Sequence, residues 1–176
     1  MCCLFGLIDP NHAYTGKQKA KMLHVLATAS EARGTDATGY ALNTGNKLYV
    51  YKRPIAGHKL QFRIRDDTTV VMGHTRMTTK GDQAQNENNH PFLGNLAGRP
   101  FALAHNGVLW NDKDLRQELK LPKTKIETDQ LHRGSATGIT SVSRFCQPEI
   151  HGRASTGDIY VYGVDGYGRA VLRSWR

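Results

Sequence analysis

The chain has 176 residues, a length that suits one domain with a substantial buried core. Hydrophobic residues make up 39% of it, and no stretch approaches the roughly 18 apolar residues that a membrane span requires, so we expect a globular protein outside the membrane. The net charge of +9 would suit an anionic partner, but the lysines and arginines are scattered singly and no nucleic-acid-binding motif is visible. We therefore do not expect nucleic acid as a partner.

Three cysteines, two of them adjacent, form no disulfide framework, and the apolar N-terminal run lacks the basic lead of a signal peptide. These features predict a cytoplasmic protein with reduced thiols.

The N-terminal part of the chain is predicted to form a strand and then a helix. Residues 4–8 are a short apolar run typical of a buried strand. Residues 17–34 have apolar side chains at helical spacing, and Gly34 is the expected C-cap. The apolar residues that we expect on the inner face of this helix are Met22, Leu23, Leu26 and Ala29.

Further along the chain, strands alternate with turns and one short helix. A hairpin is predicted around Gly45-Asn46, because the residues on both sides of this dipeptide have strand character. Two more strands, each ending in polar residues, are expected at 68–75 and 101–107. Residues 112–120 have the pattern of a short amphipathic helix capped by Asn111. This mixture predicts an α+β layered domain.

The N-terminal cysteine pair indicates nucleophilic chemistry. Removal of the initiator methionine would leave Cys2 with a free α-amine, whose reference pKa of roughly 7.7–8.0 leaves it partly neutral at cellular pH. The amine can then accept the proton of the thiol, so that nucleophile and base belong to one residue. Cys3 would lie on the opposite face of a strand and could not share this role. The alternative is that both are small buried hydrophobic residues.

Three polar groups further along the chain suit the recognition of an amino acid. Arg76, at a predicted strand end, can bind a carboxylate through both arms of its guanidinium, and Thr79 adds a hydroxyl donor. Asn106 and Gly107 offer an amide and a backbone N–H that could stabilise an oxyanion, although Asn-Gly is also a common turn. Asp129 can pair with an ammonium group, or be a solvated loop acid.

Three histidines were considered as metal ligands. His74, His90 and His105 are separated by 16 and 15 residues, so they lack the close pairs that mark a zinc site. We expect no metal site, and no cofactor.

Together these motifs resemble the glutaminase domain of the class II glutamine amidotransferases, which are N-terminal-nucleophile hydrolases. The resemblance covers about residues 2–129 and is carried by "MCCLFG", "EARGTDATGYA", "GHTRMTTKG", "NENNHPF", "AHNGVLWN" and "IETD". It implies a four-layer α/β/β/α sandwich of antiparallel sheets and hydrolysis of L-glutamine to glutamate and ammonia.

The resemblance also implies a role for each site residue. Cys2 would be the nucleophile, and Asn106 and Gly107 would bind the tetrahedral oxyanion. Arg76, assisted by Thr79, would bind the α-carboxylate of glutamine, and Asp129 would bind its α-ammonium group. The supporting residues around this site would be Arg33, Gly34, His74 and His105.

The family pattern stops after Asp129. Residues 130–176 contain six arginines and no lysine, whereas the preceding residues contain seven arginines and eleven lysines. This tail lacks the helix that the family would place next, but an alternative reading frame from about Gln130 can encode a helix-patterned segment. We therefore expect a domain over 1–129 that is incomplete at its C-terminal side, followed by an atypical tail that arose from a frame shift or is a divergent extension.

Several readings of function stay open beside glutamine hydrolysis. A related N-terminal-nucleophile amidase could act on another amide, and an inactive homologue could serve as a binding module. A basic nucleic-acid binder would show salt-dependent retention on DNA. Because no synthase domain is visible after the glutaminase motifs, the ammonia would go to a separate synthase or acceptor-binding subunit, or be released.

Overall fold

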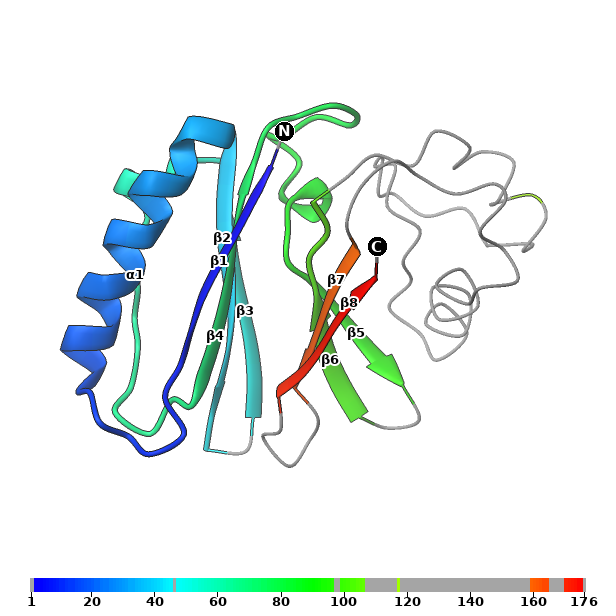
Figure 1. The fold of residues 1–176 in the computed structure, drawn as a ribbon. Coiled ribbons are helices and arrows are strands. Elements are labelled where there is room, and N and C mark those ends of the chain that lie inside the picture. The colour runs from blue at the N-terminus through cyan, green and yellow to red at the C-terminus, as the bar shows by residue number, and fades with distance from the viewer. Residues whose placement is uncertain are drawn as a thin grey trace.

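The structure is a computed structural model that describes residues 2–45, 47–96, 99–106, 117, 159–164 and 170–175. Its largest element is a four-stranded antiparallel sheet with the strand order β1-β4-β2-β3 (Figure 1). The strands of this sheet are β1 (Cys3–Ile8), β2 (Ala37–Thr44), β3 (Lys47–Arg53) and β4 (Val70–Arg76). The predicted hairpin is confirmed, because β2 pairs with β3 and the turn between them has Gly45 at a φ of +53°.

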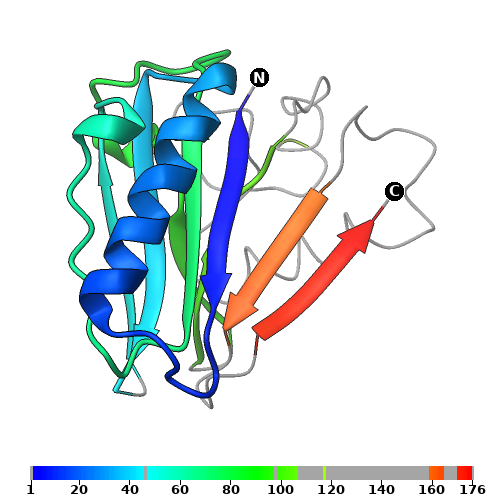
Figure 2. The ribbon, with the colours of Figure 1, turned by 60° about the vertical axis from the view of Figure 1, so that its left-hand side comes forward.

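One helix covers one face of this sheet. Helix α1 (Gly16–Ser30) lies across the sheet in Figure 2 and continues into the 3₁₀ turn η1 (Glu31–Arg33). Its N-terminus has a capping box, because the Thr15 side chain accepts from the Gln18 N–H and the Gln18 side chain accepts from the Thr15 N–H. The helix predicted over 17–34 is shorter in the structure, because α1 ends at Ser30 and Gly34 is the C-cap of η1.

The predicted inner face of α1 is largely wrong. Leu23 is buried, but Leu26 is 38% exposed. The buried positions of the helix are Gly16, Lys19, Leu23, Ala27 and Ser30. One reason for the difference is that a charged residue occupies the inner face. Lys19 is fully buried, and its Nζ lies 2.9 Å from Asp9 Oδ2. It also donates hydrogen bonds to the Asp66 and Thr68 carbonyls, so a lysine with full polar partners takes a position that an apolar pattern cannot identify.

Two apolar clusters lie on the two faces of the four-stranded sheet. On the helix face, Leu23 packs with Tyr40, Leu42 and Val71. On the opposite face, Ala41 and Met72 pack with residues of the second strand layer. Successive residues of a strand point to opposite faces, so each strand contributes alternately to both clusters.

The second layer contains two hairpins. Strand β5 (Phe92–Leu96) pairs with β6 (Arg99–Leu103), and β7 (Ile159–Val164) pairs with β8 (Ala170–Trp175). Figure 1 shows these hairpins on the side of the four-stranded sheet that faces away from α1. The order is thus helix, sheet, second strand layer, which confirms an α+β fold with antiparallel sheets. The four-layer arrangement stays a prediction, because the helical layer expected beyond the hairpins falls outside the described residues.

Other expectations have mixed outcomes. The predicted strand 101–107 ends at Leu103, and β5 was not predicted. The short helix expected at 112–120 lies outside the described residues except for Gln117, which is helical. Two short 3₁₀ turns, η2 (Gly57–Lys59) and η3 (Asn86–Asn88), are also present in the described part of the chain. No helix in the described part of the chain is long and apolar enough to cross a membrane.

Candidate functional site

Cys2 lies at the end of β1, next to the end of β4. The register pairs Cys3 with Thr75, which brings Cys2 beside Arg76. The Sγ atom of Cys2 is 3.7 Å from the Met77 carbonyl oxygen, and Arg33 Nε donates a hydrogen bond of 3.1 Å to the Cys2 carbonyl. The structure thus places the Arg33 side chain against the backbone of Cys2, and its supporting role stays a prediction.

The two cysteines differ in their position on the strand. Phe5 belongs to the cluster on the helix face and Leu4 to the cluster on the opposite face. By the alternation of strand side chains, Cys3 belongs to the helix face and Cys2 to the face that carries Leu4. This places Cys2 on the side of the second strand layer.

Gly34 is packed against the backbone that carries Arg76. A Cβ atom at this glycine would lie 2.5 Å from the Arg76 carbonyl carbon and 2.6 Å from the Met77 nitrogen. Its φ of 171° is ordinary extended backbone, so close approach and not conformation is the reason for glycine here. Asp36 adds two contacts, because its N–H donates to the Arg76 carbonyl at 3.0 Å and its Oδ2 accepts from the Thr78 N–H at 2.7 Å. The 76–78 segment is therefore held from two sides.

The guanidinium of Arg76 is buried and oriented by the loop that follows it. Only 5% of this residue is exposed. Its NH1 donates to Asn89 Oδ1 at 2.8 Å, and its NH2 donates to the Lys80 carbonyl at 2.5 Å and to the Gly81 carbonyl at 3.4 Å. Thr79, the residue expected to assist, is exposed in this same loop. A guanidinium fixed in this way presents its charge at a defined place at this end of the sheet.

Asn89 and Lys52 are site residues that the sequence reasoning did not assign. Asn89 is fully buried, and its Nδ2 donates to the Gln83 carbonyl at 2.8 Å while its Oδ1 accepts from Arg76. Lys52 Nζ donates to the Asn89 carbonyl at 2.5 Å and lies 4.7 Å from the centre of the Phe92 ring. Burial lowers the pKa of Lys52 to about 8, with Glu87 opposing this shift and Arg76 adding to it. The sequence signal for Asn89 is the "NENNHPF" motif, which does not by itself indicate a role for this residue.

The three histidines form one buried cluster. His74 Nε2 lies 3.2 Å from the His105 carbonyl oxygen and 2.9 Å from His90 Nδ1. Burial lowers the pKa of His74 to about 3, although the His105 carbonyl opposes the shift. His74 is therefore neutral near pH 7, and the carbonyl contact places its proton on Nε2. Among the described residues no group of three or more histidine, cysteine or acidic side chains is arranged to hold a metal ion.

The histidine cluster also determines where Asn106 lies. Because His105 contacts His74 on β4, the next residue is near the end of the sheet that carries Cys2 and Arg76. Asn106 is half-buried. Gly107 and Asp129 lie outside the described residues, so the oxyanion and ammonium sites stay predictions.

Comparison with solved structures shows which proteins share this fold. The chain is similar to the glutamine phosphoribosylpyrophosphate amidotransferase of B. subtilis, with a TM-score of 0.52 and 21% identity over 94% of this chain and 35% of that chain. It is also similar to a structure described as the allosteric regulatory enzyme of purine biosynthesis, with a TM-score of 0.57, 18% identity and coverage of 94% and 36%. These likenesses show a shared fold.

The family follows from the sequence comparisons. The profile of the class II glutamine amidotransferases matches residues 1–130, and the chain belongs to this family. It is 34% identical over 133 residues to a glutamine–fructose-6-phosphate aminotransferase of Chlamydia pneumoniae. This match covers 73% of the present chain and 20% of the relative. It is also 30% identical over 127 residues to an amidophosphoribosyltransferase of Methanocaldococcus jannaschii. That match covers 69% of the present chain and 25% of the relative. The chain thus spans a quarter or less of the length of these relatives.

Proposed function

We propose that this chain hydrolyses the side-chain amide of L-glutamine, with Cys2 as the nucleophile. The observation that carries the proposal is the position of Cys2 beside Arg76 at one end of the sheet, with the Arg76 guanidinium buried and oriented by Asn89. A nucleophilic thiol and a fixed cation at the same end of a sheet suit an amide substrate with a carboxylate at its other end. Membership of the amidotransferase family supports the choice of glutamine.

The proposed reaction has two chemical steps. After loss of Met1, the α-amine of Cys2 accepts the thiol proton, and the thiolate attacks the amide carbon of glutamine. The tetrahedral oxyanion is stabilised by the Asn106 side chain and the Gly107 N–H, the C–N bond breaks, and the proton leaves with ammonia. Water then attacks the glutamyl thioester, which releases glutamate and restores the thiol. This sequence needs no metal or redox cofactor.

Substrate recognition is proposed to use both ends of the amino acid. Arg76 binds the α-carboxylate with help from Thr79, and Asp129 pairs with the α-ammonium group. The relatives are named for transfer of nitrogen to fructose 6-phosphate or to a phosphoribosyl acceptor, and this chain spans only part of their length. We propose that the ammonia is used by an acceptor-binding domain or subunit supplied separately.

Covalent labelling with 6-diazo-5-oxo-L-norleucine, a glutamine analogue that alkylates nucleophilic thiols, tests this function. We expect one adduct per chain, located on Cys2 of a protein that lacks Met1, and protection by excess glutamine. Replacement of Arg76 by alanine should slow labelling by the analogue but leave labelling by iodoacetamide unchanged, because only the analogue carries an α-carboxylate. Labelling of Cys3 in place of Cys2, or retention of Met1, would contradict the proposal.

A further inference from the structure

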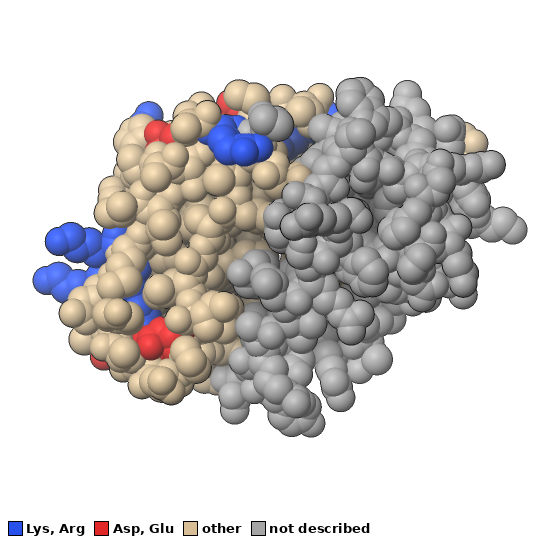
Figure 3. Space-filling model, in the orientation of Figure 1, with Lys and Arg blue, Asp and Glu red and all other residues tan. Residues whose placement is uncertain are grey.

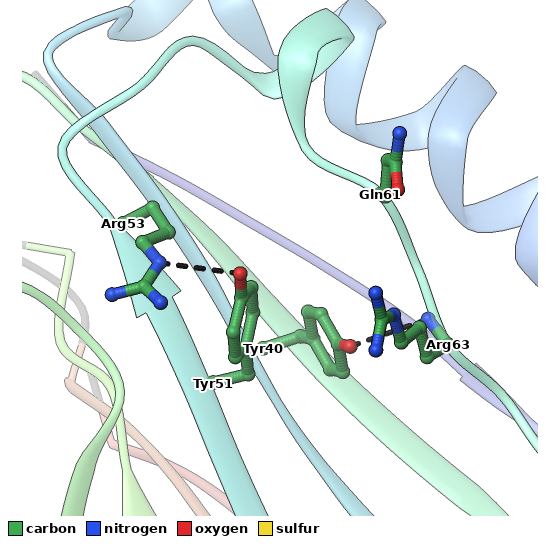
Figure 4. A pocket seen from close by; sticks show the side chains of 5 residues that line it. All are labelled: Tyr40, Tyr51, Arg53, Gln61 and Arg63. Atoms are coloured by element: carbon green, nitrogen blue, oxygen red, sulfur yellow. Dashed lines mark hydrogen bonds between the residues drawn. The ribbon is translucent and has the colours of Figure 1, made fainter.

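A cavity lies at the free edge of the four-stranded sheet, away from the site just described. It has a volume of about 370 Å³ and is lined by Tyr40, Tyr51, Arg53, Gln61 and Arg63 (Figure 4). Tyr40 belongs to the apolar cluster on the helix face of the sheet, and the register places Tyr51 opposite it. Cys2 and Arg76 belong to the other face by strand alternation. The cavity is therefore a separate place on the molecule.

The side chains in this cavity form a row of two rings between two cations. Figure 4 shows the Tyr51 and Tyr40 rings in the middle, with Arg53 at one end and Arg63 at the other. The centres of the two rings are 5.7 Å apart. Arg53 Nε donates a hydrogen bond of 3.2 Å to the Tyr51 hydroxyl, and its guanidinium carbon lies 5.1 Å from the centre of that ring. This contact leaves the two terminal nitrogens of Arg53 as donors for a ligand.

The loop side of the cavity is also held in place. The Tyr40 hydroxyl accepts a hydrogen bond of 3.3 Å from the backbone N–H of Arg63, and the Tyr40 ring packs 5.0 Å from the Phe62 ring. Burial raises the pKa of Tyr40, so its hydroxyl stays neutral at physiological pH. Tyr40 is 4% exposed and Tyr51 is 41% exposed, so one ring supports the cavity and the other presents a surface to a ligand.

The charge in this cavity is not balanced within the described part of the chain. Arg65, two residues after Arg63, forms an ion pair of 3.0 Å with Asp67. None of the ion pairs among the described residues includes Arg53 or Arg63, and the cavity has no acidic lining residue. In the view of Figure 3, basic side chains lie in small separate groups.

We propose that this cavity binds a phosphate monoester that carries a flat ring, such as a nucleoside monophosphate. A phosphate monoester has a charge of about −1.5 to −2 at pH 7, which matches two guanidinium groups, and arginine binds phosphate oxygens through paired N–H donors. The exposed part of the Tyr51 side chain offers an aromatic contact to the ring of the ligand. The volume is at the lower end of the range of small-molecule sites, about 300–1,000 Å³, so the ligand is a mononucleotide in size and not a larger cofactor.

Isothermal titration calorimetry of the full chain with three probes tests this proposal. The probes are AMP, adenosine, which has the ring without the charge, and inorganic phosphate, which has the charge without the ring. We expect saturable binding of AMP that is at least tenfold tighter than that of either fragment and that weakens as salt is added. Absence of saturable AMP binding, or phosphate binding as tight as that of AMP, would overturn the proposal.

Single replacements locate the bound ligand. Arg53→Gln and Arg63→Gln should each raise the Kd of AMP about tenfold, which is the loss expected for a charge-assisted contact. Arg65→Gln is the matched control, because it removes a neighbouring exposed cation that already has an acidic partner. These residues are exposed, so the variants should fold, and labelling of Cys2 by the glutamine analogue should be unchanged. Equal AMP affinity in Arg53→Gln and wild-type protein would place the ligand elsewhere and overturn the assignment.

Discussion

Replacement of Asn89 by alanine should affect both the stability and the glutamine affinity of the chain. The side chain is fully buried and accepts one hydrogen bond from the charged Arg76 guanidinium. Its Nδ2 donates two more, to the Gln83 carbonyl at 2.8 Å and to Asn86 Oδ1 at 3.3 Å. A buried hydrogen bond to a charged group contributes about 2 kcal/mol and one to a neutral group about 1 kcal/mol. With one bond of the first kind and two of the second, we expect the free energy of unfolding to fall by about 4 kcal/mol.

The same change should alter glutamine binding more than turnover. Without Asn89 Oδ1, the Arg76 guanidinium loses one of the contacts that fix its orientation, although the Lys80 and Gly81 carbonyls still hold NH2. The proposed partner of Arg76 is the α-carboxylate, which is remote from the amide that reacts. We expect KM for glutamine to rise about tenfold and kcat to change less, as for a loss of binding common to the ground and transition states.

Urea unfolding and initial-rate glutaminase assays measure the two effects. Gln85→Ala is the control, because Gln85 is an exposed residue of the same loop and its substitution should change stability by less than about 0.5 kcal/mol. If Asn89→Ala matches Gln85→Ala in both the unfolding free energy and KM, Asn89 does not position Arg76 and the reasoning is refuted.

Three further predictions concern the packing, the pH dependence and the gene. Gly34→Ala should lower the free energy of unfolding by about 1–3 kcal/mol and slow the labelling of Cys2, because the new Cβ would lie 2.5 Å from the Arg76 backbone. Urea unfolding measures the loss of stability, with Thr35→Ala at an exposed neighbouring position as the control. The pKa of His74 is about 3 in the folded state and 6.5 as its ordinary value. Between these two pH values the folded state keeps His74 neutral, whereas the unfolded state takes up a proton. The contribution of His74 to stability should therefore fall by about 1.4 kcal/mol per pH unit as pH decreases from 6.5 toward 3. His74→Asn should flatten this part of the unfolding curve against pH, and an unchanged slope would disprove the assignment. Sequencing of the gene should find a single-base difference from homologues near codon 130, and an intact frame would leave a divergent extension as the explanation of the tail.

Local sequence patterns predict some elements of this fold, whereas packing between distant segments determines others. The β2–β3 hairpin was predictable, because alternating strand residues and a glycine turn act over a few residues. The inner face of α1 was not, because Ala27 approaches the Gly57 turn so closely that a Cβ at Gly57 would lie 2.6 Å from the Ala27 carbonyl oxygen. Small residues at such a contact carry little hydrophobic signal, and the more apolar Leu26 stays outside.

The site shows the same division. Cys2 and Arg76 were identified from their chemistry, and the strand register brings them together. The contributions of Asn89 and Lys52 could not be derived from the pattern, because their role depends on hydrogen bonds between segments that are 37 residues apart. Buried polar networks have no sequence period, so they are found only when the fold is known.

The most direct test of the proposed function is the release of glutamate from glutamine by three versions of the full chain. We predict measurable release by the wild-type protein, release of similar rate by Cys3→Ala, and no release above background by Cys2→Ala. Cys3 is the natural control, since it is the adjacent thiol and belongs to the opposite face of β1. Glutamate release by Cys2→Ala at the wild-type rate would show that a different group attacks the amide, and release by none of the three would show that this chain is not a glutaminase.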